Sequence, residues 1–297
     1  MILDKFWAYL PLILVCGILS LLLAVLNVFR RRIRLKSLRP SFRQNLLRIP
    51  GGSLLRSLDN LYEQINLYLI YVIMLPLIIY SALISYSYFQ ATQPAPAIIW
   101  MSAIICMAMI TYLVFNLVRL LSQRKRIRLE FEGELAVAHE LNQLMLRGFQ
   151  VYHDFPADTF NIDHIVVGSI GVFAVETKTR GKEKGAGSGR NSGEATVTYD
   201  GRMLNYADSS DFETIEQARE QADWLSKWLE GATGEPIAVR AIVTLPGWVV
   251  RRTSADGIPV VNPGQFASLF EHIKPRPVSE TMLKHIKDQL ELKCRSY

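Results

Sequence analysis

Residues 161–178 read NIDHIVVGSIGVFAVETK, and this stretch decides the fold of the C-terminal half of the chain. Two runs rich in β-branched residues, 161–167 and 172–179, flank the segment Gly168-Ser-Ile-Gly171. β-Branched residues favour strands, and two glycines this close favour a turn. The pattern therefore predicts a β-hairpin.

Charged side chains stand at the open end of this predicted hairpin. Side chains two residues apart in a strand share a face, so Glu176 and Lys178 point the same way. The turn folds the first arm back, which brings Asp163 beside Glu176. Burying such charges costs free energy unless they are paired with opposite charges or serve a functional site.

Two carboxylates that converge on one point suit a hard cation such as Mg²⁺, which prefers oxygen ligands. A metal ion of this kind lowers the pKa of water and binds phosphate oxygens. Lys178 would orient that water or balance negative charge in the transition state. The reaction that these groups suit best is metal-assisted hydrolysis of a phosphodiester bond.

The rest of the C-terminal half shows alternating helical and extended patterns. We expect helices at 130–147, 213–229, 266–273 and 278–292, and extended segments at 149–154, 195–204, 237–245 and 258–261. This order predicts an α/β fold, in which helices flank a mixed sheet.

Four separated motifs in this half resemble the nuclease-related domain, NERD, of the PD-(D/E)xK nuclease superfamily, over about residues 130–250. They are Gly133-Glu134, Asn161-Ile-Asp163-His164, Gly171-Val-Phe-Ala-Val-Glu176-Thr-Lys178 and Gln217-Ala218. The resemblance implies a restriction-endonuclease-like mixed-sheet domain, a Mg²⁺ or Mn²⁺ cofactor and a nucleic-acid substrate, with DNA favoured.

The resemblance also implies a role for each matching residue. Asp163 and Glu176 would be metal ligands, and Glu134 would add a third carboxylate to the metal or to its water. Lys178 would be the catalytic lysine, and Gln217 would face the site from the second helix. Gln221 lies one turn after Gln217, so the sequence leaves open which glutamine faces the site.

Each of these residues also has a purely structural interpretation. Glu176 and Lys178 could form an ion pair, Asp163 could cap a turn, and Glu134 and Gln217 could lie on solvated helix faces. His164 should point to the face of the sheet opposite Asp163 and serve in packing. Trp224, Trp228 and Trp248 should also serve in packing. The superfamily's proline is replaced by Ile162.

The N-terminal half contains three long apolar runs, Phe6–Phe29, Leu67–Phe89 and Ala97–Val118. About 20 apolar helical residues cross a bilayer, so we expect three transmembrane helices. The first run is longer than the apolar part of a signal peptide and ends in Arg30-Arg31-Arg32, which favours a retained helix. Pro76 lies inside the second run, where membrane helices tolerate it.

Basic residues fix the expected orientation of these helices. Residues 1–128 hold 15 Lys/Arg against 3 Asp/Glu, whereas residues 129–297 hold 18 against 24. The basic residues gather in the 30–56 loop and after the third run, which predicts that both lie in the cytoplasm and the N-terminus outside. We expect a multi-pass protein of a bacterial inner membrane. The 30–56 loop could also bind anionic lipid or nucleic-acid phosphates.

We therefore divide the chain into a membrane anchor with a basic loop at 1–122, a nuclease-like domain at 123–273 and a C-terminal helix at 274–297. The first functional hypothesis is a membrane-anchored nuclease. The second is a non-catalytic module that binds nucleic acid or protein, which the acidic balance of residues 129–297 favours. A phosphate-binding face would use the basic residues Lys178, Arg180, Lys182, Lys184 and Arg190.

Overall fold

The computed structural model describes residues 46–90, 95–181 and 195–295. The chain divides into two compact units. Of the described residues, one unit holds 58–90 and 95–125, and the other holds 46–57, 126–181 and 195–295. The α/β unit is thus assembled from two separate stretches of sequence, with residues 58–125 between them.

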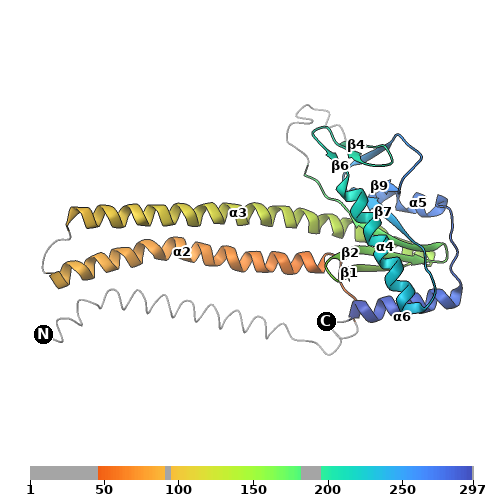
Figure 1. The fold of residues 1–297 in the computed structure, drawn as a ribbon, viewed down its shortest axis with the longest axis horizontal. Helices are drawn as coiled ribbons and strands as arrows, with labels where there is room; N and C mark the ends of the chain where they lie inside the picture. Colours follow the sequence, from red (N-terminus) through yellow and green to blue (C-terminus); the bar gives the residue numbers. More distant parts are fainter. Residues whose placement is uncertain (1–45, 91–94, 182–194, 296–297) are drawn as a thin grey trace. The chain divides into compact units, whose positions relative to one another are not determined.

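Two long helices dominate the first unit (Figure 1). Helix α2 spans Gly52–Gln90 and continues through Pro76, and helix α3 spans Pro96–Gln143. Both contain a stretch that is long and apolar enough to cross a membrane, and 6% or less of each stretch is buried. The structure thus shows two candidate spans where the sequence predicted three. The predicted first span, Phe6–Phe29, lies outside the described residues.

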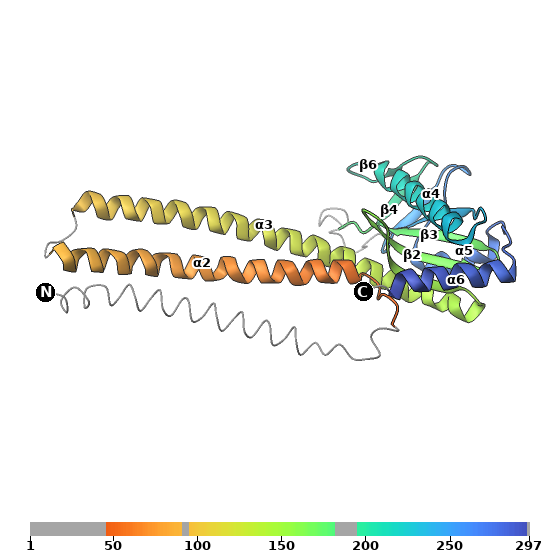
Figure 2. The ribbon, with the colours of Figure 1, turned by 60° about the horizontal axis from the view of Figure 1, so that its bottom comes forward.

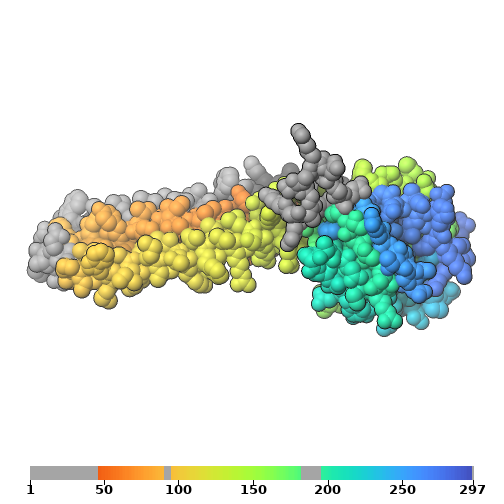
Figure 3. Space-filling model, turned by 90° about the horizontal axis from the view of Figure 1, so that it is seen from above, coloured from red at the N-terminus to blue at the C-terminus, as the bar shows by residue number. Residues whose placement is uncertain are grey.

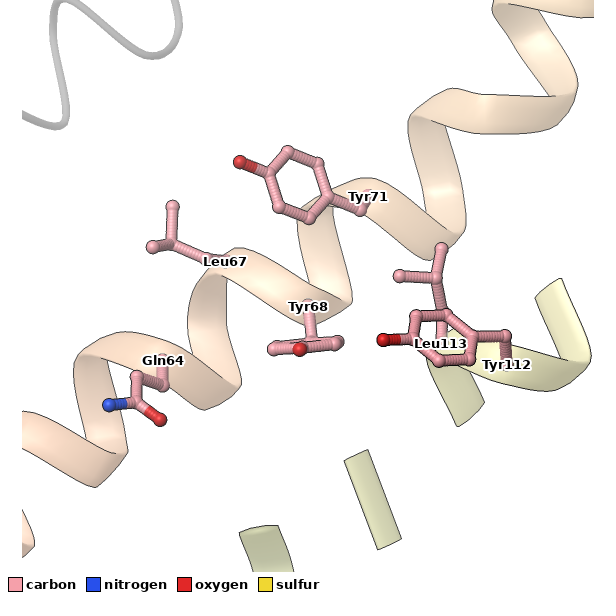
Figure 4. A pocket seen from close by; sticks show the side chains of 6 residues that line it. All are labelled: Gln64, Leu67, Tyr68, Tyr71, Tyr112 and Leu113. Atoms are coloured by element: carbon pink, nitrogen blue, oxygen red, sulfur yellow. The ribbon is translucent and has the colours of Figure 1, made fainter. Parts of the chain in front are cut away.

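A hollow lies between α2 and α3 within this unit. Its lining comes from four residues of α2 and two of α3, namely Gln64, Leu67, Tyr68, Tyr71, Tyr112 and Leu113. Figure 4 shows Tyr68 and Tyr112 facing the same space from the two helices. Its lining is therefore mostly tyrosine and leucine.

The second unit is built on a five-stranded sheet with the order β1-β2-β3-β7-β9. Its strands are β1 Gln150–Pro156, β2 Asn161–Gly168, β3 Gly171–Thr177, β7 Val239–Thr244 and β9 Val260–Val261. The first three run antiparallel, and β3, β7 and β9 run parallel to one another. The predicted hairpin is confirmed, since Gly168 pairs with Gly171 across its turn.

Helices cover both faces of this sheet, as alternate strand residues require. Val172 and Ala174 of β3 pack in one core with α4, Glu213–Thr233, and α6, Glu280–Arg295. Phe173 and Val175 pack in a second core with the end of α3 and with α5, Phe266–His272. Figures 1 and 2 show α4 lying across the sheet. The predicted mixed α/β fold is therefore observed.

A second, smaller sheet was not predicted as such. Its order is β6-β5-β4-β8, with β4 Thr196–Tyr199, β5 Leu204–Asn205, β6 Ser210–Asp211 and β8 Val249–Arg252. In the space-filling view, segments after residue 195 form much of the visible surface of the α/β unit (Figure 3). Strand β6 ends just before α4, so this small sheet positions the first turn of that helix.

The helix predicted at 130–147 is not a separate element but the end of α3, followed by a 3₁₀ turn at Leu144–Arg147. Gly148 ends it in the left-handed conformation, with φ of 87°. Gly133 lets this helix approach the chain after β3, because a Cβ at Gly133 would overlap Cγ2 of Thr179. The close approach brings the next residue, Glu134, toward the end of β3.

Gly133→Ala should therefore destabilise the α/β unit by about 1–3 kcal/mol, the usual cost of overpacking. The matched control is Gly231→Ala in α4, where a Cβ meets no atom within 4 Å. Relief of the helical glycine should raise stability there by about 0.5–1 kcal/mol. Thermal unfolding of the full chain in detergent measures both, and equal shifts in the two variants would contradict the close approach.

Candidate functional site

Asp163 and Glu176 lie opposite each other at the open end of the β2–β3 hairpin. The register pairs His164 with Val175, so the next position outward sets Asp163 against Glu176. Opposed residues in an antiparallel pair share a face. Glu176 continues the row of Val172 and Ala174 on the α4 face of the sheet and is 6% exposed, whereas Asp163 is half-buried.

Helix α4 supplies two amides to the Glu176 carboxylate. Gln217 Nε2 donates to Oε1 at 2.9 Å, and Gln221 Nε2 donates to Oε2 at 2.6 Å. The sequence left open which glutamine faces the site, and the structure shows that both do. Oε1 of Gln221 is buried and has no hydrogen-bond partner among the described residues, which leaves one acceptor beside Glu176 for a ligand or water.

Asp163 is held from the backbone of β3. The Thr177 N–H donates to Asp163 Oδ2 at 2.7 Å. Thr177 also links the site to the other face of the sheet, because its Oγ1 lies 3.2 Å from His164 Nε2.

Two buried histidines extend this link away from the carboxylates. His164 Nδ1 lies 2.8 Å from His153 Nδ1, and His153 Nε2 lies 3.2 Å from Asn142 Oδ1. Every group is satisfied when the Thr177 hydroxyl donates to His164, His164 to His153 and His153 to Asn142. His164 therefore lies opposite Asp163, in packing, as predicted.

Helix α3 brings Glu134 toward this pair, and it is 8% exposed. Burial, followed by the negative charges of Asp163 and Asp154, raises the pKa of Glu134 to about 9. The nearby backbone of Gly51 acts in the opposite direction and lowers the pKa of Glu134. Glu134 is thus a buried acid within electrostatic range of Asp163, not a residue on a solvated helix face.

Burial also raises the pKa of both hairpin carboxyls. The pKa of Asp163 stands well above its usual value, first because of burial and second because of the Glu176 charge. The pKa of Glu176 is raised to about 7 by burial, although Gln221 and Lys178 lower it. Mutually repelling carboxyls without enough positive charge are a frequent feature of functional sites.

Lys178 follows directly after β3, where its peptide N–H donates to the Thr244 carbonyl at 2.9 Å. Its ammonium lies 3.9 Å from Asp211 Oδ2, and its side chain is 40% exposed. Its charge also favours the ionised form of Glu176. Lys178 is thus at the site and accessible.

The predicted basic patch is described only in part. Arg180 pairs with Asp208 at 2.6 Å and lies over the Tyr206 ring. Lys182, Lys184 and Arg190 lie outside the described residues. Trp248 is 9% exposed, and Trp224 and Trp228 pack against the core, so the packing role expected of all three holds.

Asp154 is a further acidic residue that the sequence analysis missed. It is 1% exposed and adopts a positive φ of 48°, which aspartate tolerates better than most residues. Asn161 donates to its Oδ1 at 3.1 Å, which gives the first residue of the hairpin motif a structural role. A single acidic residue in a predicted strand does not indicate, from the sequence alone, that it is buried or which residues it contacts.

Within the described part of the chain, no group of three or more His, Cys, Asp or Glu side chains is arranged to hold a metal ion as it stands. The donor chemistry nevertheless fits a hard cation, since Glu134 and Glu176 are buried, Asp163 is half-buried, and desolvation and mutual repulsion oppose the ionisation of all three carboxyls. The open Gln221 oxygen adds a neutral acceptor.

These features define an α/β domain with a buried acidic site at the end of a hairpin. Residues 129–246 match the family model of NERD, the nuclease-related domain. The chain therefore carries a NERD domain, with two helices apolar enough to span a membrane N-terminal to it. No curated protein and no solved structure matches the chain.

The histidine pair makes the stability of this domain depend on pH. Burial lowers the pKa of His153 from 6.5 to about 4, so the folded protein stays neutral there while the unfolded chain takes up a proton. The contribution of neutral His153 to the free energy of unfolding is therefore fully present above pH 6.5. It is lost as the pH falls toward 4, and the loss is at most about 3 kcal/mol.

His153→Gln should flatten this loss between pH 6.5 and 4, because glutamine does not titrate. The control is His139→Gln, which alters an exposed histidine of α3. Thermal midpoints of the full chain across this pH range give the comparison. Parallel pH profiles for wild type and His153→Gln would refute the assignment of the acid-labile group.

Proposed function

We propose that the chain is a membrane-anchored nuclease that hydrolyses phosphodiester bonds, with DNA as the favoured substrate. The observation that carries the proposal is the closeness of two carboxyls, the half-buried Asp163 and the buried Glu176, at the end of a hairpin inside the NERD match. The nuclease-related domain supports nucleic acid as the substrate class. The mixed sheet with helices on both faces is compatible with the restriction-endonuclease-like fold that the resemblance implies.

Asp163, Glu176 and Glu134 would hold Mg²⁺ or Mn²⁺. The metal ion, when bound, supplies a positive charge that stabilises phosphate oxygens and lowers the pKa of water. Gln217 and Gln221 fix both oxygens of Glu176, and the Thr177 N–H fixes Asp163. Pre-oriented ligands of this kind cost little reorganisation when the substrate arrives.

Lys178 would act as the catalytic lysine. Its ammonium is accessible and is close enough to Glu176 to favour that residue's ionised form. Placed beside a phosphodiester, it would balance negative charge as the transition state develops. Release from Asp211, at 3.9 Å, requires little energy because the pair is partly exposed.

Lys178→Ala should reduce Mg²⁺- or Mn²⁺-dependent cleavage of DNA by the full chain in detergent by about 100-fold or more, which corresponds to about 3 kcal/mol of transition-state stabilisation. The control is Lys227→Ala, an exposed lysine of α4. Cleavage of labelled single- and double-stranded DNA, with RNA as comparison, is measured on gels. Unchanged cleavage in Lys178→Ala would remove the lysine from the mechanism.

A non-catalytic binding module is the second candidate. It is favoured by the absence, among the described residues, of a ready three-acid metal group and by the pairing of Lys178 with Asp211. This candidate predicts that the wild-type chain binds nucleic acid or a protein partner without turnover. The same gels separate the two candidates, because binding shifts the substrate whereas hydrolysis shortens it.

The anchor would place the α/β unit on the cytoplasmic side of a bacterial inner membrane. Basic residues flank both described candidate spans on the same side, with Arg48 and Arg56 before α2's apolar part and Arg124–Arg128 after that of α3. Positive flanks remain in the cytoplasm. The basic 30–56 loop would contact anionic lipid there.

A green fluorescent protein fused to the C-terminus should therefore fluoresce in bacterial cells, and alkaline phosphatase fused at the same point should be inactive. Both fusions should sediment with membranes. Fusion of each reporter to the 91–94 link gives the reciprocal control, because that link should lie outside. An active phosphatase at the C-terminus would reverse the proposed topology.

A further inference from the structure

The segment that leads into α2 packs against the acidic site of the α/β unit. Residues Arg48–Ser53 form a turn in which the Gly52 N–H donates to the Ile49 carbonyl at 3.2 Å. Gly51 has a positive φ of 63°, and α2 begins at the next residue. Leu47, just before the turn, packs against the core of the unit. The segment thus belongs to the α/β unit, although it lies more than 70 residues before the NERD match.

Asp154 is the anchor point for this segment. Arg48 NH1 donates to the Asp154 carbonyl at 2.9 Å and lies 3.4 Å from Oδ2. The Ser53 N–H donates to the same Oδ2 at 3.1 Å. Asp154 therefore accepts one of the first N–H groups of α2, which lack partners inside the helix and favour negative charge.

Arg48 is well suited to this contact. Its side chain is only 10% exposed, against 1% for Asp154. A buried ion pair is strongly destabilised when one partner is lost, because the other charge stays buried without compensation. The position of the whole turn therefore depends on Arg48.

Gly51 touches the candidate metal ligand. Its backbone lies against the Glu134 carboxyl group. A Cβ at Gly51 would lie 2.6 Å from Cδ2 of Phe131 and 3.5 Å from Oε2 of Glu134. No side chain fits at Gly51 without displacing the Phe131 ring, which lies beside the Glu134 carboxyl group at this point.

We propose that residues Arg48–Ser53 are a positioning element of the acidic site, in which Arg48 docks on Asp154 so that the Gly51 backbone packs against Phe131 and Glu134 and holds Glu134 in place as a metal ligand. The inference rests on the proposed function, because it assigns the Glu134 carboxylate to a bound divalent cation. The segment is neither catalytic nor a ligand. It acts through Glu134.

The experiment measures Mn²⁺ binding, not activity, by electron paramagnetic resonance on the full chain in detergent. Two matched pairs of variants isolate the effect. Gly51→Ala and Gly148→Ala both place a side chain at a positive φ, but a Cβ at Gly148 meets nothing within 4 Å. Arg48→Gln and Arg56→Gln each remove one positive charge beside Asp154, but Arg56 NH2 is 3.7 Å away and its side chain is 51% exposed.

We expect Gly51→Ala and Arg48→Gln to weaken Mn²⁺ binding by about 10- to 100-fold, the usual effect of losing a group that orients a metal ligand. Gly148→Ala should leave the affinity unchanged within about twofold. Removing a positive charge near an acidic site strengthens cation binding by electrostatics alone. Arg56→Gln should therefore bind Mn²⁺ with equal or higher affinity than the wild type, whereas Arg48→Gln should bind it with lower affinity.

Thermal unfolding without metal shows that each variant is folded, and Arg48→Lys, which keeps the charge and a donor, should recover part of the lost affinity. Equal affinities for Gly51→Ala and Gly148→Ala, or tighter binding by Arg48→Gln, would overturn the positioning role while the proposed function stands. A wild-type chain that takes up no Mn²⁺ would overturn the proposed function, and the positioning role with it.

Discussion

The opposition of two carboxyls at the end of the β2–β3 hairpin is the constraint on which the site depends. Asp163 and Glu176 share a face by strand register, and neither can move away without breaking the pairing of a buried strand. Ionising both in this position is costly, which the raised pKa values express. The amides of Thr177, Gln217 and Gln221 surround the pair and offset part of that cost. A divalent cation would offset much of the remainder.

The alternation of side chains along β3 lets one strand serve both faces of the sheet. Glu176 lies under α4, whereas the Thr177 side chain reaches the histidines on the α3 face and its backbone holds Asp163. The histidine pair is buried, and burial favours its neutral form. A polar chain of this kind, fully satisfied, fixes a unique arrangement of the strands. The position of Asp163 thus depends on packing that lies behind the sheet.

The hairpin, the main helices and the faces of Asp163, Glu176 and His164 could be predicted because local spacing determines them. The pairing of both glutamines with Glu176 could not, since it depends on the rotation of α4 over the sheet. The short strands β6 and β8 were missed because two to four residues are too few to show an alternation of apolar and polar side chains. Helix α3 runs on from the predicted span into the predicted 130–147 helix because no glycine or proline separates the two. The role of Asp154 could not be predicted because its partners, Arg48 and Ser53, lie 106 and 101 residues away in the sequence.

The α/β unit is discontinuous in sequence, and this has a consequence for how it must be studied. Residues 42–57 and 126–297 form one unit, and residues 58–125, which hold most of both described candidate spans, lie between them in the sequence. A fragment that begins at residue 123 retains the NERD match but loses Arg48 and the first N–H groups of α2. Asp154 would then keep its burial and its bond from Asn161 while losing its compensating charge. A buried carboxylate without a counter-charge must protonate or drive local rearrangement. Because Asp154 already acts on the pKa of Glu134 and Asp163, that rearrangement would begin inside the acidic site itself.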